Sequence, residues 1–435
     1  MLPLPKTLRV RWSIFGFMFA VGLVAYLQQK SLTIAADRME PELGLSQFAI
    51  GWIRTSFLVA YALFQLPAGL IGERYGARRT LVGAGLLSIV AVLAMPAAPL
   101  LLSGSALFVA MLLAQFTLGI SHAFVWPVSS GVLSRWFPSN RWALILGLQT
   151  MGLGIGSMIT PPLISQLMVN FGWQRAIALA AVPAIPFVLL WGWYGRNTPA
   201  EHPGVSAAEL AELDGPARGV QGPDVAAEAG SLRRELMALL GNRQVLVLSF
   251  SYLCMNYLFY LLGDWVFLYL RQERHFSIVD SGWLASLPPL LAAIGAGVGG
   301  AVGTVLCGRF GPRWGLALVG IVALPLAGLL LLVAISTGNP TLAVAALTAA
   351  YGAVELTEGP YWAAAMSAGG RNTMAIGGIL NTGGNLGGVI TTPIVGYLSG
   401  IGHWDFAFYI GAGFALAGTV AWFLVGDGAR TGQGR

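Results

Sequence analysis

The stretch GLIGERYGARR, residues Gly69–Arg79, is a short charged loop between two long apolar runs. Its glycines allow a tight turn and a close approach of helices, whereas its arginines do not readily enter lipid. A shorter copy, RFGPR at Arg309–Arg313, lies between two apolar runs about half a chain later. GSMITPP from Gly156 and GGVITTP from Gly387 match at nearly the same offset. The pattern predicts two copies of one membrane unit.

The composition is that of a membrane protein. Hydrophobic residues make up 56% of the chain and charged residues 10%, whereas a soluble domain has roughly 25% charged residues. A bilayer core requires about 20 apolar residues per helix, and the chain supplies many such runs. We therefore expect most of it to be intramembrane helix. The net charge of +6 follows from where the basic residues fall and does not indicate nucleic-acid binding.

The cysteines and the N-terminus indicate neither a cofactor nor processing. Cys254 and Cys307 both fall within apolar runs, which disfavours a disulfide or a metal framework. The first residues, MLPLPKTLRVRW, lead into a full-length span without a small-residue cleavage site, so no cleaved signal peptide is expected. We predict no cofactor and no metal site.

The apolar runs predict twelve transmembrane helices, near residues 12–33, 50–72, 79–101, 104–132, 142–169, 174–194, 245–271, 279–306, 313–336, 341–367, 373–399 and 404–426. Residues 196–243 hold proline, glycine and charges of both signs, and are predicted to link a first half, 1–195, to a second, 244–435. Within the linker, SAAELAEL at Ser206–Leu213 has the pattern of an amphipathic surface helix.

The basic residues predict the orientation, because loops rich in Lys and Arg remain in the cytoplasm. Most basic residues lie on one side of the predicted bundle: before the first helix, in the loops after even-numbered helices, in the linker and in the tail. They are Lys6, Arg9, Arg11, Arg74, Arg78, Arg79, Arg135, Arg141, Arg196, Arg218, Arg233, Arg234, Arg243, Arg309, Arg313, Arg371, Arg430 and Arg435. The opposite loops hold Arg38, Arg175, Arg271 and Arg274. Both termini and the linker are therefore expected in the cytoplasm.

Twelve spans in two halves, with a G-x3-[DE]-R-x-G-x-R-R loop after the second helix, resemble the major facilitator superfamily. Four pieces resemble its anion:cation symporter family, which includes bacterial sugar-acid and vesicular organic-anion transporters. They are GWIRTSFLVAYALFQLPAG on the second helix, SRWFPSNR after the fourth, GWLASLPPL on the eighth and ILNTGGNLGG on the eleventh. The resemblance implies an all-α membrane protein, with twelve transmembrane helices in two pseudo-symmetric six-helix bundles. It also implies a cytoplasmic gate at Glu73, Arg74 and Arg78.

The chain departs from this family at the positions that carry charge in the relatives. The family has Tyr-x-Asp-Arg on the first helix, where this chain has Tyr26-Leu27-Gln28-Gln29 followed by Lys30. The family has an Arg and, seven residues later, a Glu on the fourth helix. Here these positions are Gln115 and His122. In the relatives the carboxylates resemble proton-coupling sites and the arginines resemble anchors for the substrate anion.

Other polar residues at membrane depth are candidates for replacing the lost groups, because ionisable side chains there usually face a cavity. The expected substrate-binding residues are Gln28, Gln29, Lys30, Arg54, Tyr61, Gln115, Tyr260 and Asn381. Lys30 and Arg54 lie near the outer ends of their helices and have snorkelling to the interface as the alternative. Asn381 and Asn385 share a helical face; Asn381 is the better candidate for a ligand contact, packing is the alternative for Asn385, and Tyr61 and Gln65 are weaker candidates.

Four residues are expected to take part in proton coupling: His122, Asp264, Glu355 and Glu358. Imidazole changes charge between pH 5 and 8, and His122 stands where the family has a Glu. The alternative for His122 is a hydrogen bond between helices. The alternative for Asp264 and Glu355 is a structural ion pair.

No feature predicts an enzyme, because a nucleotide-binding loop, a metal-ligand spacing and a soluble catalytic domain are all absent from the sequence. The leading hypothesis is a monomeric secondary transporter in the inner membrane that moves a small organic anion with protons. An acidic pocket formed by the seventh and tenth helices favours instead a cationic or neutral, amphipathic solute. A transporter-like sensor that binds without transport is the third hypothesis.

Overall fold

A computed structural model of the protein describes residues 9–45, 47–213, 241–266, 269–270, 273–276, 284, 286–369 and 373–425. This part of the chain is helical, without a strand. It divides into two compact units. Unit 1 holds Met1–Trp136, Ile155–Ala227 and Asn372–Gly378, and unit 2 holds Phe137–Gly154, Glu228–Arg371 and Ile379–Arg435.

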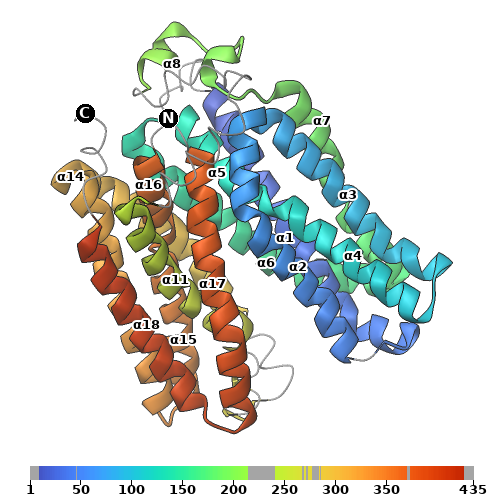
Figure 1. Ribbon diagram of the computed structural model, residues 1–435. Helices are drawn as coiled ribbons and strands as arrows, with labels where there is room; N and C mark the ends of the chain where they lie inside the picture. The colour runs from blue at the N-terminus through green and yellow to red at the C-terminus, as the bar shows by residue number, and fades with distance from the viewer. Residues whose placement is uncertain are drawn as a thin grey trace. The chain divides into compact units, whose positions relative to one another are not determined.

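Unit 1 contains α1 (Arg9–Leu43), α2 (Gln47–Tyr75), α3 (Ala77–Leu101), α4 (Gly104–Ala123), α5 (Val125–Trp136), α7 (Ala184–Tyr194) and α8 (Ala207–Ala211). α3 packs beside α4 and α7, and α2 packs against α4 (Figure 1). The core between them is apolar and includes Phe57, Met95 and Met111. α2 and α4 approach closely because Gly119 has no side chain. A Cβ atom at this position would collide with the carbonyl oxygen of Phe57.

Unit 2 contains α11 (Arg243–Asp264), α14 (Leu287–Ser336), α15 (Pro340–Glu355), α16 (Glu358–Gly369) and α18 (Trp404–Leu424). α14 packs against α15 and α18, and α11 against α18 (Figure 1). α14 lies especially close to α15 and to the residue that follows it, because Gly295 and Gly299 have no side chains. Cβ atoms there would collide with the carbonyl oxygens of Gly352 and Leu356.

Two helices contribute to both units. α6 (Trp142–Ala180) begins in unit 2 and continues from Ile155 in unit 1. α17 (Thr373–Gly400) begins in unit 1 and continues from Ile379 in unit 2. Each unit therefore includes the first turns of a helix whose longer part belongs to the other unit.

The two related loops share one backbone conformation. Gly76, in RYGARR, has φ of 82° and ψ of 149° and separates α2 from α3. Gly311, in RFGPR, has φ of 79° and ψ of 164° and divides α14 into two spans. A side chain is strained at such positive φ values, so both loops require glycine. The sequence repeat is therefore also a repeat of backbone geometry.

Ten helices in the described residues are long and apolar enough to cross a membrane. One of them, Leu287–Ser336, includes the predicted span 313–336 and all but the first eight residues of the predicted span 279–306. α17, which is rich in glycine, corresponds to the eleventh predicted span. Large apolar side chains cover the outside, and Leu100 and Val169 are each 80% exposed. Such a surface suits lipid rather than water. The predicted fourth and tenth helices are each interrupted, between α4 and α5 and between α15 and α16. Phe124 and Leu356 keep right-handed helical φ and ψ angles, so each interruption, called a break below, is an irregular turn within one apolar span.

Candidate functional site

The first polar site lies in unit 1, beside the break between α4 and α5. α4 ends at Ala123 and α5 begins at Val125. His122, in the last turn of α4, places its Nε2 atom 3.1 Å from Oε1 of Gln28 on α1. Because an amide oxygen only accepts, Nε2 donates this bond. Both side chains are buried, with 4% and 3% exposure, and the Gln28 amide nitrogen has no partner among the described residues.

Aromatic rings lie beside this pair, and two further amides are buried on α2 and α4. Phe57 of α2 meets the His122 ring edge-on, with centroids 5.4 Å apart, and stacks on Tyr61 at 5.8 Å. Gln115 is buried on α4, seven residues before His122. Gln65 is fully buried on α2, and neither of its side-chain polar atoms has a partner in the described part of the chain. The site therefore combines neutral hydrogen-bonding groups with an aromatic face.

The predicted cations of unit 1 are not joined to this pair. Gln29 and Lys30 are half-buried on α1, and Arg54 is exposed on α2. Within the described residues, neither Lys30 nor Arg54 forms a hydrogen bond or an ion pair. Both side chains are therefore available to another partner, lipid headgroups and a bound anion included.

The second polar site lies in unit 2, at the break between α15 and α16. α15 ends at Glu355 and α16 begins at Glu358. Both carboxylates are buried, with 3% and 8% exposure. Oε1 of Glu358 accepts two hydrogen bonds, from the Tyr252 hydroxyl at 2.9 Å and from Nε1 of Trp362 at 2.8 Å. Glu355 makes no hydrogen bond to another described residue.

α11 and α17 extend this polar site with amides and a tyrosine. The side chain of Asn256 donates to the carbonyl of Tyr252 at 2.9 Å. The Tyr260 hydroxyl donates to Oδ1 of Asn385 at 2.7 Å, and Asn385 donates to the carbonyl of Asn381 at 2.8 Å. The predicted site residues Tyr260 and Asn381 therefore meet through Asn385.

Asp264 lies apart from this network. Its side chain is exposed at the end of α11. Tyr257, which the helical spacing places on the same face, is fully buried and stacks on Phe414 with ring centroids 4.2 Å apart. Tyr257 and Asp264 lie on the same face of α11, but Tyr257 is packed inside unit 2 and Asp264 is at its surface.

The two breaks occupy equivalent places in the sequence repeat. His122 precedes Pro127 by five residues, and Glu355 precedes Pro360 by five residues. Each proline is the third residue of the helix that follows the break, where its missing N–H leaves no intrahelical bond unmade. Interrupted helices at corresponding positions of two repeats are a sign of a binding site in transporters.

The charged loop forms a third cluster, within unit 1. Glu73 pairs with Arg135 of α5 and accepts the backbone N–H of Met374 at 2.6 Å, in the first turn of α17. A carboxylate is stabilised by the free N–H groups of a helix N-terminus. Arg78 instead donates from Nε to the carbonyl of Gly192 near the end of α7, at 2.8 Å. Arg74 is exposed and lies over the Tyr75 ring, 5.6 Å from its centroid.

Sequence reasoning missed two partners in these clusters. Nothing in the sequence distinguishes Tyr252 from other aromatic residues in apolar spans, and its hydrogen-bond partner Glu358 is 106 residues away in the chain. The sequence pattern indicates only a role in orientation for Arg135, which pairs with Glu73, 62 residues away. The sequence signal for Tyr252 was its place on the span that also carries Asn256 and Tyr260. In the part of the chain that the structure describes, no three His, Cys, Asp or Glu residues are grouped so that they could hold a metal ion.

Comparison with known proteins identifies the family. The Major Facilitator Superfamily matches residues 18–305 and 291–434. The chain belongs to the Major Facilitator Superfamily. It is accordingly an integral membrane protein and a transporter of small molecules, not an enzyme. The predicted superfamily and its all-α, twelve-helix fold are confirmed.

Its curated relatives include anion transporters of similar length. The chain is 26% identical over 424 residues to a probable sulfoacetate transporter of Cupriavidus necator, covering 96% of this chain and 94% of that protein. It is 26% identical over 432 residues to a probable galactarate/D-glucarate transporter of Bacillus subtilis, with 97% and 93% covered. It is also 26% identical over 415 residues to the hexuronate transporter of Bacillus subtilis, with 93% and 92% covered.

Solved structures of the superfamily share the fold. A variant of the E. coli fucose:proton symporter has a TM-score of 0.69 at 15% identity, covering 96% of this chain and 100% of that one. A proton:xylose symporter bound to a halogenated deoxyglucose has a TM-score of 0.76 at 13% identity, covering 97% of each chain.

Proposed function

We propose that this superfamily member moves a small organic anion, a sugar acid or another carboxylate, by alternating access and with proton coupling. Relatives that match nearly its whole length are named as transporters of sulfoacetate, galactarate or D-glucarate and hexuronate. These solutes are all small acids. The superfamily fold supplies the alternating-access architecture.

The observation that carries the proposal is the repeated break beside His122 and Glu355. An irregular turn within a transmembrane helix loosens its regular backbone hydrogen bonding, and the polar groups that it frees are satisfied where the turn faces protein or a cavity. Here each break places ionisable side chains at membrane depth, five residues before a proline. His122, Glu355 and Glu358 are therefore the proposed proton-coupling groups, with Asp264 as the surface-exposed fourth.

The proposed substrate contacts combine the amide and aromatic groups of the two sites with the two free cations. They are Gln28, Gln29, Lys30, Arg54, Tyr61, Gln115, Tyr260 and Asn381. The amides and tyrosines suit the hydroxyl groups of a sugar acid, because they both donate and accept hydrogen bonds. A cation in a site that excludes water attracts a carboxylate far more strongly than it does in water. Glu73, Arg74 and Arg78 form the proposed gate.

We further propose that the protein lies in the cell membrane as a monomer, with both termini and the 196–243 linker in the cytoplasm. The positions of Lys and Arg support this orientation. Residues 1–195 and 244–435 would be the two six-helix halves that rock in alternating access. The bilayer, the substrate and protons are the expected partners, and nucleic acid is not one.

Uptake into proteoliposomes tests the proposal. D-glucarate, galactarate, a hexuronate and sulfoacetate are offered with and without an inward proton gradient. We expect uptake of at least one acid, stimulated by the gradient. His122→Gln should abolish the stimulation and leave exchange of labelled for unlabelled substrate. Arg54→Gln should weaken binding itself. Binding of organic cations without binding of any carboxylate would refute the proposal.

A second substrate class is favoured by the buried carboxylates of unit 2. Glu355 and Glu358 have no basic partner among the described residues, and Tyr252 and Trp362 lie against Glu358. Acidic groups with aromatic neighbours suit a cationic or neutral amphipathic solute. The same vesicles, offered quaternary ammonium and amine solutes, distinguish this class. Binding of either class without transport would indicate a sensor.

A further inference from the structure

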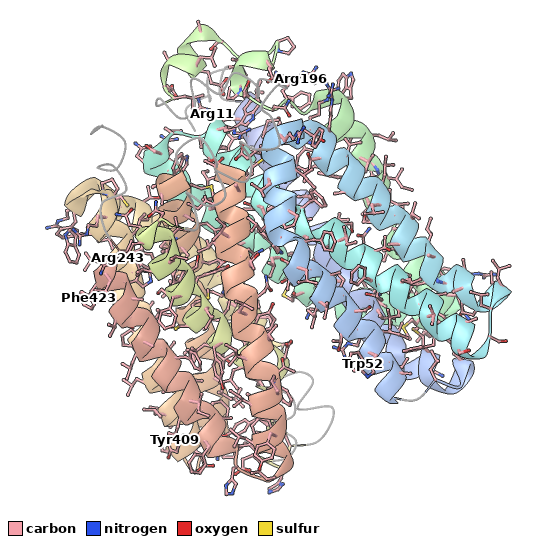
Figure 2. All side chains as sticks on the ribbon, viewed as in Figure 1. Arg11, Trp52, Arg196, Arg243, Tyr409 and Phe423 are labelled. Atoms are coloured by element: carbon pink, nitrogen blue, oxygen red, sulfur yellow. The ribbon has the colours of Figure 1, made fainter. Side chains whose placement is uncertain are left out.

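The residues that follow α7 return over one end of unit 1. We call residues 197–213 the strap. It contains the short η3 turn (Pro199–Glu201) and α8, the helix predicted near Ser206–Leu213. Figure 1 shows α8 at the end of unit 1 where α1 begins, and Figure 2 shows Arg11 and Arg196 at that end, with Trp52 toward the opposite end.

The strap is anchored at its start to α3. Oδ1 of Asn197 accepts the backbone N–H of Arg78, at 3.0 Å. Thr198 and, at the far end of the strap, Leu213 are both buried. Because buried residues occur at both ends, the segment is packed against the unit rather than extended into solvent.

A buried ion pair anchors its second half to α1. Nε of Arg11 lies 2.9 Å from Oε1 of Glu209, and Nη2 lies 3.1 Å from Oε2 of Glu212. Arg11 is 1% exposed and Glu209 is 3% exposed. Glu209 is further fixed by its backbone N–H, which donates to Oγ of Ser206 at 3.2 Å. Removal of Arg11 would leave the buried Glu209 without a basic partner, and removal of Glu209 would leave Arg11 only the exposed Glu212, so either change disfavours the docked state.

His202 holds the middle of the strap against α5 and α7. Its ring contacts Tyr194 edge-on at 4.7 Å and Trp136 at 5.9 Å between centroids. The backbone N–H of Gly204 donates to Nδ1 of His202 at 3.1 Å. Nδ1 must therefore carry no proton in the docked strap, and the ring is neutral with its proton on Nε2.

The charges around His202 also disfavour its protonation. Arg196 follows α7 and repels an imidazolium, Glu209 of α8 attracts one, and Arg11 of α1 is bound to that same glutamate. α5 contributes the uncharged Trp136, and α7 contributes Tyr194. Burial of the ring, and after it Arg196, lower the pKa of His202 from 6.5, with Glu209 opposing in part.

We propose that the strap is a pH-released clamp, in which protonation of His202 detaches residues 197–213 from α1, α3, α5 and α7. A proton on Nδ1 replaces the acceptor of the Gly204 N–H with a second donor, so the bond is lost. Because the pKa is lower docked than released, docking is fully stable above about pH 6.5 and weakens as the pH falls below it. On the proposed function and orientation, a transporter that brings protons into the cytoplasm would lose these contacts with the strap as that compartment acidifies.

Hydrogen–deuterium exchange on the intact protein in nanodiscs tests the clamp without any substrate. Exchange is measured at pH 7.5 and 5.5 and normalised to the intrinsic rate at each pH. From the ordinary histidine pKa, we expect the normalised exchange of the strap to rise about tenfold at pH 5.5. No such rise in the wild-type protein would overturn the clamp.

Variants assign the effect to His202. His202→Asn keeps an acceptor near the Nδ1 position, and His202→Phe keeps the ring contacts; neither titrates, so both should lose the pH dependence. His403→Asn is the matched control, because His403 is exposed at the start of α18, and it should behave as wild type. Glu209→Gln should raise exchange at both pH values. A pH response that persists in the folded His202 variants would contradict the proposal.

A transport measurement tests the regulatory part separately. The exchange of labelled for unlabelled substrate is compared at equal pH on both sides, as the ratio of wild type to His202→Asn. We expect this ratio to differ between pH 7.5 and 5.5, because only the wild-type strap is released by acid. A constant ratio would remove the regulatory role. If no anion were transported at all, the proposed function would fail while the deuterium result still decided the clamp.

Discussion

At the scale of single residues, Tyr252 is the most informative position for testing the acidic site. Tyr252→Phe removes one of the two hydrogen bonds to Glu358 and keeps the ring contacts with Tyr361 and Trp362. A hydrogen bond to a charged group contributes roughly 1.5–3 kcal/mol. We therefore expect proton-stimulated uptake to fall about tenfold or more, measured as the initial rate in proteoliposomes.

The matched control for this substitution is Tyr409→Phe. Tyr409 is 52% exposed on α18, and its hydroxyl contacts no carboxylate among the described residues. Its loss should leave uptake unchanged. Equal rates for Tyr252→Phe and wild type would exclude Glu358 from coupling.

The sequence predicted single residues where burial of a charge is unusual in itself. His122, Glu355 and Glu358 were recognisable because ionisable groups at membrane depth are rare. Gln28 was recognisable as a site residue but its bond to His122 was not, and Tyr252 was not recognisable, because a tyrosine in an apolar span has packing as an equally good explanation. Which hydroxyl reaches Glu358 depends on the packing of α11 against α16, and one sequence does not specify that distance.

At the scale of elements, the contact of α14 with α15 is a test of close helix packing. A methyl group on Gly299 would collide with the carbonyl oxygen of Leu356, which lies in the break before α16. Overpacking of a tight contact costs about 1–3 kcal/mol. Gly299→Ala should therefore lower the thermal unfolding temperature of the detergent-solubilised protein and reduce transport, because the break must move.

Gly413→Ala is its control, since nothing lies within 4 Å of the added atom on α18. The expected change there is a small gain in stability, because alanine favours helix. If the two variants melted at the same temperature, the close approach of α14 to the break would be wrong.

The extent of the helices followed from apolar length, but their breaks did not. A span is predicted by about 20 apolar residues, and neither Phe124 nor Leu356 interrupts such a run. The usable signal was in Pro127 and Pro360, which stand at the same place in the two repeats. A proline in an apolar span is compatible with a kink, a break or an unbroken helix, so its effect is decided by the surrounding packing.

At the scale of the whole molecule, the topology is testable with introduced cysteines. Cys254 and Cys307 are first replaced by serine. A cysteine at Gly402, in the turn before α18, should react with an impermeant maleimide added to sealed cells. A cysteine at Glu201, exposed in the strap, should react only after permeabilisation. Labelling of Glu201→Cys in sealed cells would reverse the proposed orientation.

The repeat predicted the architecture of the molecule but not how the chain is shared between its two units. RYGARR and RFGPR indicated equivalent turns, and Gly76 and Gly311 adopt nearly the same φ and ψ values. The inclusion of 137–154 in unit 2 and of 372–378 in unit 1 depends on packing between distant segments. Gly147 and Gly378 allow such close packing, but a glycine in the sequence does not indicate which helix packs against it.

Glu73 connects this sharing of the chain to the transport cycle, because it holds the first turn of a helix that continues in unit 2. It accepts the Met374 N–H and pairs with Arg135, so Glu73→Gln removes the charge that both favour. Loss of a charged hydrogen bond costs roughly 1.5–3 kcal/mol, so the start of α17 should be released more often. We expect opening toward the cytoplasm to become about tenfold more frequent.

The measurement is the labelling rate of a cysteine at Gln29 in inside-out vesicles, in a background lacking the native cysteines. Arg74→Ala should act in the same direction but less, because Arg74 is exposed and contacts the Tyr75 ring. Asp405→Asn, an exposed acid in the first turn of α18, should leave the rate unchanged. If Glu73→Gln labelled and transported as wild type does, the Glu73–Arg135 pair would anchor the loop without gating. The charge of this loop would then matter for orientation alone, since Arg74 and Arg79 would still keep it out of the bilayer.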